Sequence, residues 1–231
     1  MNQHTITIQE VSFIQVNGAW IAEDTIIGTN VTIFPGAVLG RPAISTKAQV
    51  RQTNDESLPP LIIGDNCVIG ANVVLYRGTS IGNNCLLGDT ACIREKVTIG
   101  DSSIIAMGVT INYDTSIGSR VKIMDNSHIT GNMIVEDDVF ISDLVASAND
   151  NSMGREVAHN VPIELRKRGG PIIRRHATIG QGACILPGIE IGENSIIGAN
   201  AVVTKSIPKH VLVMGIPARV IRNLREDEIK L

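Results

Sequence analysis

"IGENSIIGANAVVTKSIP" occupies residues 191–208 and returns to an aliphatic residue at every sixth position. Ile191 and Ile197 each precede a glycine, and Val203 follows six residues later. A six-residue period matches neither the 3.6-residue period of a helix nor the two-residue period of a strand. It is typical of a short strand followed by a turn, repeated many times.

The same period runs through most of the chain. From residue 63 to residue 141 it is unbroken, and every sixth residue is aliphatic: Ile63, Ile69, Leu75, Ile81, Leu87, Ile93, Ile99, Ile105, Ile111, Ile117, Ile123, Ile129, Val135 and Ile141. The position four residues later is nearly always small or β-branched, and glycine often follows the aliphatic residue. We expect both periodic positions to face an interior and the glycines to adopt the backbone angles of corners. Units this short bury their apolar faces only by stacking on one another.

Composition narrows the class of protein. The 231 residues are 43% hydrophobic but only 3% aromatic, which predicts a thin interior of aliphatic side chains. A formal net charge of -3 argues against nucleic acid or an anionic membrane as a partner. We find no secretory signal at the start and no apolar run of about 18 residues. The four cysteines lack CxxC spacing, so we expect a cytoplasmic protein with reduced thiols.

Two polar segments interrupt the repeat, at about 41–60 and 142–171, and we expect both to form loops. The repeat ends after Val203. We therefore expect a solenoid domain over residues 1–209, carrying both loops, and a cap over residues 210–231. Within the cap, residues 218–229 place Val220, Ile221 and Leu224 on one side of a predicted helix.

The repeat resembles that of the hexapeptide-repeat transferases. The resemblance implies an all-β fold, a left-handed parallel β-helix with triangular coils, completed here by the short C-terminal helix. It also implies a homotrimer whose active sites lie between adjacent subunits.

Two C-terminal segments resemble the acetyl-CoA-dependent members of that family: "IGANAVVTKSIP" at 197–208 and "GIPARVIR" at 215–222. The resemblance implies that coenzyme A contacts six positions, which are Gln181, Ala199, Thr204, Lys205, Arg219 and Arg222. Lysine and arginine suit this role because coenzyme A carries a diphosphate and a ribose phosphate. The alternative is that these cations are solvated surface charges.

The middle of the chain resembles the N-acetyltransferases of nucleotide-linked amino sugars. The similar segments are "VKIMDNSHITGNMIVEDDVFIS" at 121–142 and "SANDNSMGR" at 147–155. The resemblance implies that Asn149 and Asp150 hold the acceptor near the thioester. Met124 replaces a glutamine of that family, which leaves the acceptor open between an amine and a hydroxyl.

Two histidines are candidates for the general base. His128 precedes Ile129 in the repeat and is expected to face outward, whereas His159 lies in the second loop. A neutral imidazole near a bound amine or hydroxyl can accept its proton. The alternative for His128 is a surface or subunit-contact residue. We predict no metal site, because the chain lacks the closely spaced histidine pair of the zinc enzymes that share this fold.

The resemblance therefore implies an acetyl-CoA-dependent acyltransferase with a small-molecule acceptor and acetyl-CoA as co-substrate. The acceptor amine or hydroxyl would attack the thioester directly, and a nucleotide-linked amino sugar is the expected acceptor. Two alternatives stay open. One is a non-catalytic trimeric β-helix that serves as a binding or assembly module, and the other is an O-acetyltransferase of another small acceptor.

Overall fold

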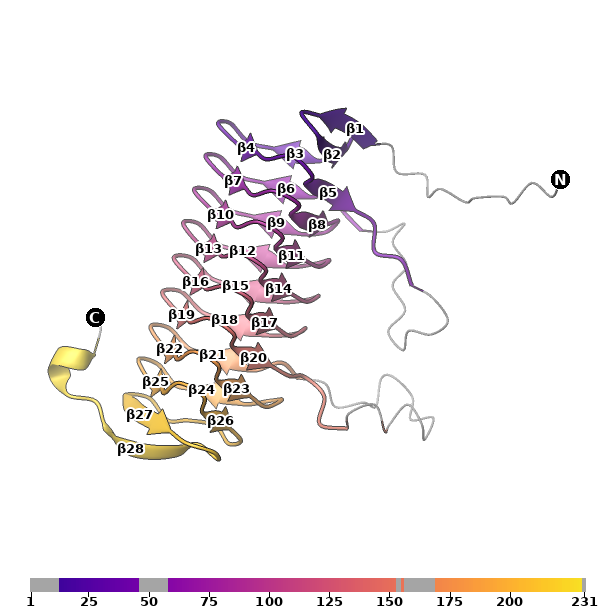
Figure 1. Ribbon diagram of the computed structural model, residues 1–231. Helices are drawn as coiled ribbons and strands as arrows, with labels where there is room; N and C mark the ends of the chain where they lie inside the picture. Colours follow the sequence, from indigo (N-terminus) through magenta and orange to yellow (C-terminus); the bar gives the residue numbers. More distant parts are fainter. Residues whose placement is uncertain (1–12, 46–57, 153–154, 156–168, 230–231) are drawn as a thin grey trace.

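The computed structural model describes residues 13–45, 58–152, 155 and 169–229 as a stack of coils with three sheet walls (Figure 1). We call these walls the first, second and third sheets.

The first sheet contains, in order along the stack, β1 (Phe13–Val16), β2 (Ala19–Ala22), β5 (Val38–Arg41), β8 (Val74–Tyr76), β11 (Cys92–Ile93), β14 (Thr110–Ile111), β17 (His128–Ile129), β20 (Ala146–Ser147), β23 (Cys184–Ile185) and β26 (Val202–Val203). The second contains β4 (Thr32–Ile33), β7 (Val68–Ile69), β10 (Leu86–Leu87), β13 (Ile104–Ile105), β16 (Lys122–Ile123), β19 (Phe140–Ile141), β22 (Thr178–Ile179), β25 (Ile196–Ile197), β27 (Val211–Met214) and β28 (Arg219–Asn223). The third contains β3 (Ile26–Ile27), β6 (Ile62–Ile63), β9 (Ser80–Ile81), β12 (Thr98–Ile99), β15 (Ser116–Ile117), β18 (Ile134–Val135), β21 (Ile172–Ile173) and β24 (Glu190–Ile191).

Three repeats make one coil. Parallel neighbours such as Leu87 and Ile105 lie 18 positions apart, as do the hydrogen-bonded side chains of Thr98 and Ser116. The offset is larger for the strand pairs that span either of the two insertions, as where Ile26 pairs with Ile62 and Ile134 pairs with Ile172. Extra residues leave the stack there without disturbing the alignment of the coils. β20 lies within the residues 142–171 that the sequence assigns to the second loop, so the coil continues further than that boundary.

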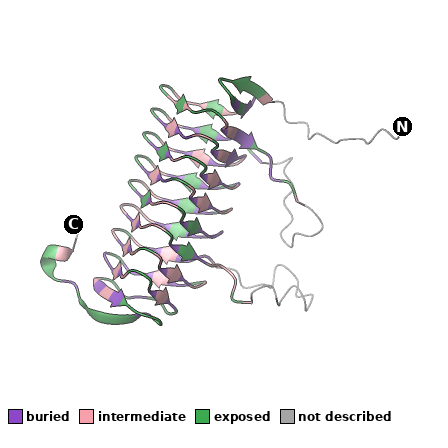
Figure 2. Cartoon of the chain, in the orientation of Figure 1, coloured by how far each residue is buried: buried purple, intermediate pink, exposed green. Residues whose placement is uncertain are grey.

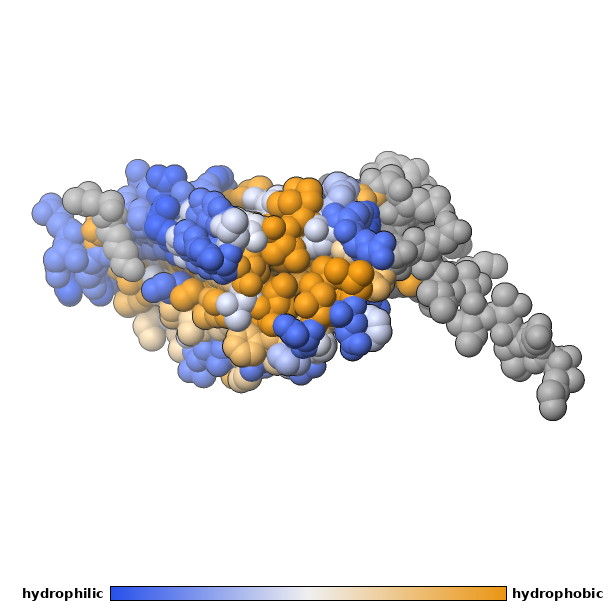
Figure 3. Space-filling model, turned by 90° about the horizontal axis from the view of Figure 1, so that it is seen from above, coloured by the Kyte–Doolittle hydropathy of each residue, from blue (hydrophilic) through white to orange (hydrophobic). Residues whose placement is uncertain are grey.

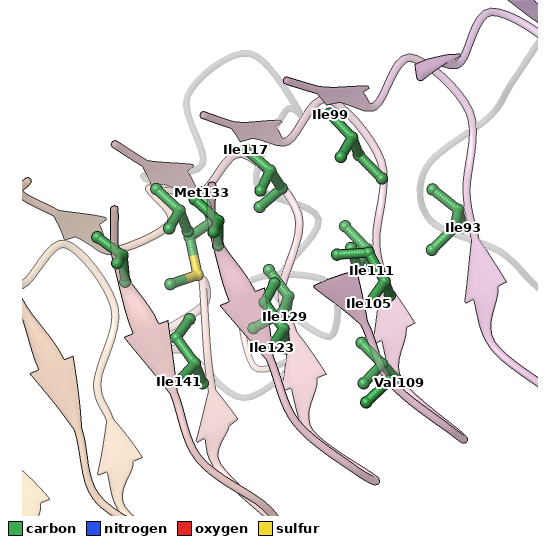
Figure 4. Packing of buried hydrophobic residues seen from close by; sticks show 14 of the residues in the cluster. Ile93, Ile99, Ile105, Val109, Ile111, Ile117, Ile123, Ile129, Met133 and Ile141 are labelled. Carbon is green, nitrogen blue, oxygen red and sulfur yellow. The ribbon is translucent and has the colours of Figure 1, made fainter. Parts of the chain in front are cut away.

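The interior confirms both periodic positions. All fourteen aliphatic residues from Ile63 to Ile141 are buried, and the small or β-branched residues four positions later are buried as well (Figures 2 and 4). Polar members of the second column bond to the next coil: Thr79 Oγ1 donates to the Arg94 carbonyl at 2.7 Å, and Ser127 Oγ donates to that of Ser142 at 2.8 Å. A hydroxyl is tolerated inside because its hydrogen bond offsets the cost of burial.

The prediction that these glycines adopt the special backbone angles of corners is wrong. Positive φ falls three residues after the aliphatic residue, often on asparagine, as at Asn66 (57°) and Asn84 (57°). Glycines directly after the aliphatic residue have ordinary φ but lie against the next coil. A Cβ on Gly70 would come within 2.6 Å of the Asp89 amide nitrogen. These glycines permit close contact between coils, whereas asparagine tolerates the left-handed corner.

We predict that Gly70→Ala destabilises the protein by about 1–3 kcal/mol, because backbone atoms of the next coil must move to admit the methyl group. Gly169→Ala is the matched control, since among the described residues its Cβ would meet nothing closer than 4.0 Å. Urea unfolding followed by circular dichroism measures both variants. Equal midpoints would contradict the close-contact explanation.

The two ends of the stack differ. Figure 3 looks down on the N-terminal end and shows apolar side chains gathered near its centre. Ile27, Val31 and Ile33 of the first coil pack against the core but are only partly buried, because little of the described chain covers them.

The predicted C-terminal helix is wrong. β27 pairs in parallel with β25, and β28 returns antiparallel to β27, followed by a short 3-10 turn, η3 (Glu226–Glu228). Val220 and Ile221 are exposed rather than packed as one helical face. The last coil leaves a row of unpaired peptide groups, which a strand can pair with and a helix cannot.

All four cysteines are free, and Cys67 and Cys85 are buried one coil apart. Within the described part of the chain, we find no helix whose length and apolar character would let it cross a membrane.

Candidate functional site

The parallel strands of the first sheet from β5 to β26 all end at one edge of the solenoid, which we call the first corner. It consists of the two residues that follow the buried residue of each of these strands: 40–41, 76–77, 94–95, 112–113, 130–131, 148–149, 186–187 and 204–205. Both long connections leave the stack here, one after β5 and one after β20 (Figure 1). Both interruptions of the repeat therefore begin at the first corner, next to side chains of the first sheet.

The structure brings His128 and Asn149 to neighbouring coils. β17 and β20 are paired, with His128 opposite Ala146. Asn149 follows β20, and its Nδ2 donates to the carbonyl oxygen of Gly131 at 3.1 Å. Because this bond ties the corner after β20 to the corner after β17, the candidate base His128 and the candidate acceptor-binding residue Asn149 lie on neighbouring coils of the same wall.

His128 faces outward, as the hexad count predicts, and lies beside two polar residues of the coil before it. Its Nδ1 is 2.7 Å from Thr110 Oγ1, and its Nε2 is 3.5 Å from Asn112 Nδ2. An amide nitrogen can only donate, so the geometry favours a proton on Nδ1 and a lone pair on Nε2. The surrounding wall partly excludes water and lowers the pKa of His128 below its ordinary value of 6.5. The imidazole is therefore neutral at pH 7, as a general base must be.

Sequence reasoning missed both partners of His128. Thr110 stands 18 positions before the histidine, so the coil length alone predicts that it stacks there. Asn112 lies at the first corner two residues further on. His159, the second candidate base, lies outside the described residues.

Asp150 holds the turn that follows Asn149. Its Oδ1 accepts a hydrogen bond from the Ser152 amide at 2.7 Å and another from the Ser152 hydroxyl at 2.5 Å. Both bonds favour the ionised carboxylate. The arrangement gives Asp150 a clear part in positioning the turn.

The six predicted coenzyme A positions are all exposed and lie at the C-terminal end of the stack. Gln181 and Ala199 occupy turns of adjacent coils, where the Gln181 carbonyl accepts from the Asn200 amide at 2.8 Å. Thr204 and Lys205 follow β26 at the first corner.

Arg219 and Arg222 both lie on β28 but differ in their contacts. Ala218 donates to the Val202 carbonyl at 2.8 Å, which places Arg219 beside β26. Arg222 instead forms a two-point ion pair with Glu228, with both nitrogen–oxygen distances at 2.7 Å. That guanidinium holds the pKa of Glu228 down at about 2. Gln181 and Ala199 therefore lie in turns that follow strands of the second sheet, Thr204 and Lys205 lie past the end of β26 on the last coils, and Arg222 is engaged with its own chain.

Within the described residues, no group of three or more His, Cys, Asp or Glu side chains converges as metal ligands. The polar groups of the candidate site include imidazole, amide, hydroxyl and guanidinium. This set suits proton transfer and phosphate binding.

Comparisons with known proteins agree with this architecture. Residues 78–113 and 170–205 match the family model "Bacterial transferase hexapeptide (six repeats)", and residues 60–88 match "Hexapeptide repeat of succinyl-transferase". The matched stretches include coils on both sides of the second loop.

Two enzymes illustrate the relatives of known activity. The galactoside O-acetyltransferase of Lactococcus lactis is 40% identical over 77 residues, which is 31% of this chain and 37% of that protein. The serine acetyltransferase of Buchnera aphidicola is 43% identical over 65 residues, or 28% of this chain and 25% of that protein. This chain thus spans well under half the length of either relative.

Among solved structures, LpxA of Acinetobacter baumannii superposes with a TM-score of 0.71 at 21% identity, covering 90% of this chain and 73% of that one. The UDP-N-acetylglucosamine acyltransferase of Campylobacter jejuni has the same TM-score at 19% identity, covering 91% and 78%. At these identities the likeness concerns the fold.

Proposed function

We propose that this chain, whose solenoid is built from the hexapeptide repeats of bacterial transferases, is an acetyl-CoA-dependent acyltransferase acting on a small molecule. The observation that carries the proposal is the arrangement of the first sheet. His128 on β17, Asn149 and Asp150 after β20, and Thr204 and Lys205 after β26 all lie on one wall and its corner.

The spacing suits a long co-substrate. β17 and β26 are three strand positions apart in the first sheet, about 14 Å along the stack. Acetyl-CoA is extended, with its thioester at one end and its phosphates at the other. We place the phosphates near Lys205 and Arg219 and the thioester toward His128, so that acceptor and acetyl group meet beside β17 and β20.

The transfer itself is a direct displacement. The acceptor nitrogen or oxygen attacks the thioester carbonyl, the carbon–sulfur bond breaks, and coenzyme A leaves as its thiol. Nε2 of His128 takes the proton that the acceptor loses and passes it to the departing sulfur, and a backbone N–H stabilises the oxyanion. Asn149 holds the corner beside the acceptor, and Asp150 fixes the turn that carries it.

For the acceptor we propose an amino group on a nucleotide-linked sugar, which the segments at 121–142 and 147–155 support by resemblance. Transfer to a hydroxyl is the second candidate. It is supported by the named activity of the Lactococcus relative and by a neutral histidine at His128. A coupled assay for free thiol separates the two, with nucleotide-linked amino sugars in one set and galactosides and serine in the other.

We also propose that the protein acts as a cytoplasmic homotrimer with the site between subunits, which the family resemblance supports. Light scattering in solution measures the mass of the assembly. A mass of one chain would contradict the trimer.

Calorimetry with acetyl-CoA tests the proposal against a non-catalytic module, which should bind none. We predict that replacing both Lys205 and Arg222 with alanine raises the Kd for acetyl-CoA by at most about thirtyfold, the value reached when each cation contributes on the order of 1 kcal/mol. Arg222 must break its ion pair with Glu228 to reach a phosphate, which reduces its contribution to the binding free energy.

The matched control for this prediction removes two positive charges elsewhere. Lys122 is the first residue of β16 in the second sheet, and Arg120 lies two residues before it. Both are exposed. Their double alanine variant should bind acetyl-CoA normally. If both double variants bind like the wild type, Lys205 and Arg222 are ordinary surface charges.

A further inference from the structure

A second cluster of side chains occupies the first corner on the N-terminal side of His128. It consists of Arg41, Tyr76, Arg94, Glu95 and Tyr113, which follow or end the strands β5, β8, β11 and β14. The chain has two tyrosines, and both are here. In a protein with so few aromatic residues, the presence of both tyrosines in this cluster distinguishes the first corner from the rest of the solenoid.

Cations and rings alternate along this cluster. The guanidinium carbon of Arg41 lies 4.9 Å from the centroid of the Tyr76 ring, and Arg41 also donates to the Tyr76 hydroxyl. Arg94 lies between the two tyrosines, 5.5 Å from the Tyr76 centroid and 5.8 Å from that of Tyr113. These distances are within the range of cation–π attraction. Both guanidinium groups are therefore held in place before any ligand arrives.

Glu95 orients Arg94 from inside the coil. The Glu95 residue is 0% exposed, and its carboxylate accepts from Arg94 Nε at 3.0 Å and from Nη2 at 3.1 Å. A buried carboxylate needs such a partner. The pairing uses one edge of the guanidinium, and the Arg94 side chain remains 30% exposed. Part of the Arg94 guanidinium side chain thus remains accessible to a ligand.

The cluster carries one positive charge beyond its internal pair. Arg94 and Glu95 neutralise each other, and within the described part of the chain Arg41 forms no ion pair. Arg41 is exposed. A pre-oriented arginine beside a second guanidinium is a suitable site for phosphate or carboxylate oxygens.

We propose that Arg41 and Arg94 bind the phosphate groups of the acceptor, while its reactive group lies at His128. This rests on the proposed function. β11 and β5 are two and four strand positions from β17 in the first sheet, about 10 Å and about 19 Å along the stack. The acceptor would then extend from His128 toward the N-terminal end, away from coenzyme A. A nucleoside diphosphate joined to a sugar has the required separation of charge and reactive group.

Because both tyrosines lie in the cluster, protein labelled with 3-fluorotyrosine has two 19F signals, and both report on this site. We expect titration with UDP to shift the signals, and uridine, which lacks phosphate, to shift them far less. Arg41→Ala should weaken UDP binding about tenfold, and Arg41→Lys should restore part of it. Arg120→Ala, which removes a cation from a different corner, should bind UDP like the wild type.

Two results would overturn the proposal: UDP shifts neither signal, or Arg41→Ala binds UDP as tightly as the wild type. Equal shifts with uridine and UDP would also contradict it, because phosphate would then contribute nothing. The titration contains no acetyl-CoA, so its failure is distinguishable from failure of the proposed acyl transfer. Calorimetry with acetyl-CoA tests the latter separately.

Discussion

Ile99→Asp is expected to leave the protein unfolded. Ile99 lies on β12, is 3% exposed, and points into the interior among the other aliphatic residues of the column (Figure 4). A carboxylate there has no partner, and its burial costs several kcal/mol on top of the lost apolar contacts. A total of about 5 kcal/mol or more equals a large part of the stability of an ordinary domain.

Thr98→Asp is the matched control, because Thr98 is the exposed neighbour of Ile99 on the same two-residue strand. It should change the free energy of unfolding by no more than about 0.5 kcal/mol. Far-UV circular dichroism and urea unfolding measure both variants. If Ile99→Asp unfolds at the wild-type urea concentration, the column does not form a continuous interior.

His128→Ala is expected to lower kcat about 100- to 10,000-fold and to leave the affinity for acetyl-CoA unchanged. The range is the usual contribution of a positioned general base. The loss should appear in kcat because the imidazole acts when the acceptor gives up its proton. Steady-state kinetics with free-thiol detection, together with calorimetry, separates the two quantities.

Lys122→Ala is the control for His128→Ala. Lys122 holds the equivalent exposed position before an aliphatic residue, but on the second sheet. It should keep full activity. If His128→Ala is also fully active, the proton acceptor is another group and hydroxyl transfer loses its main support.

The pH dependence of kcat provides a further check on His128. The wall lowers the pKa of the imidazole below 6.5, so the base stays deprotonated through neutral pH. Activity should therefore be flat near pH 7 and fall only as the pH drops below that lowered pKa. A fall that begins above pH 6.5 would contradict a desolvated base.

Much of the fold could be predicted from the sequence. An aliphatic residue at every sixth position leaves one way to bury all of them together, which is a stack of short strands and turns. The register follows for the same reason, because a slip by one residue would turn Ile63 and its successors outward. The exposure of His128 follows from the same count, and its stacking on Thr110 follows once a coil is known to hold three repeats.

Other features depend on contacts that the period does not contain. Arg41 meets Tyr76 across the first insertion, where the 18-residue offset fails, and Arg222 pairs with Glu228 beyond the end of the repeat. The different roles of the two kinds of corner residue also became clear only from the structure. Glycine permits close approach between coils, and asparagine adopts positive φ.

The sequence by itself determined the interior of this protein and the direction in which His128 faces, because both depend on a short period that repeats many times, whereas the expected coil of three repeats came from the family resemblance. The tertiary structure alone decided that the C-terminal segment is a hairpin and that two insertions, two tyrosines and the candidate site share the first corner. These are single contacts between distant or non-repeating residues, and no periodic pattern records them. An amphipathic stretch such as Val220 and Ile221 suits a helix or a strand, and the open edge of the last coil selects the strand.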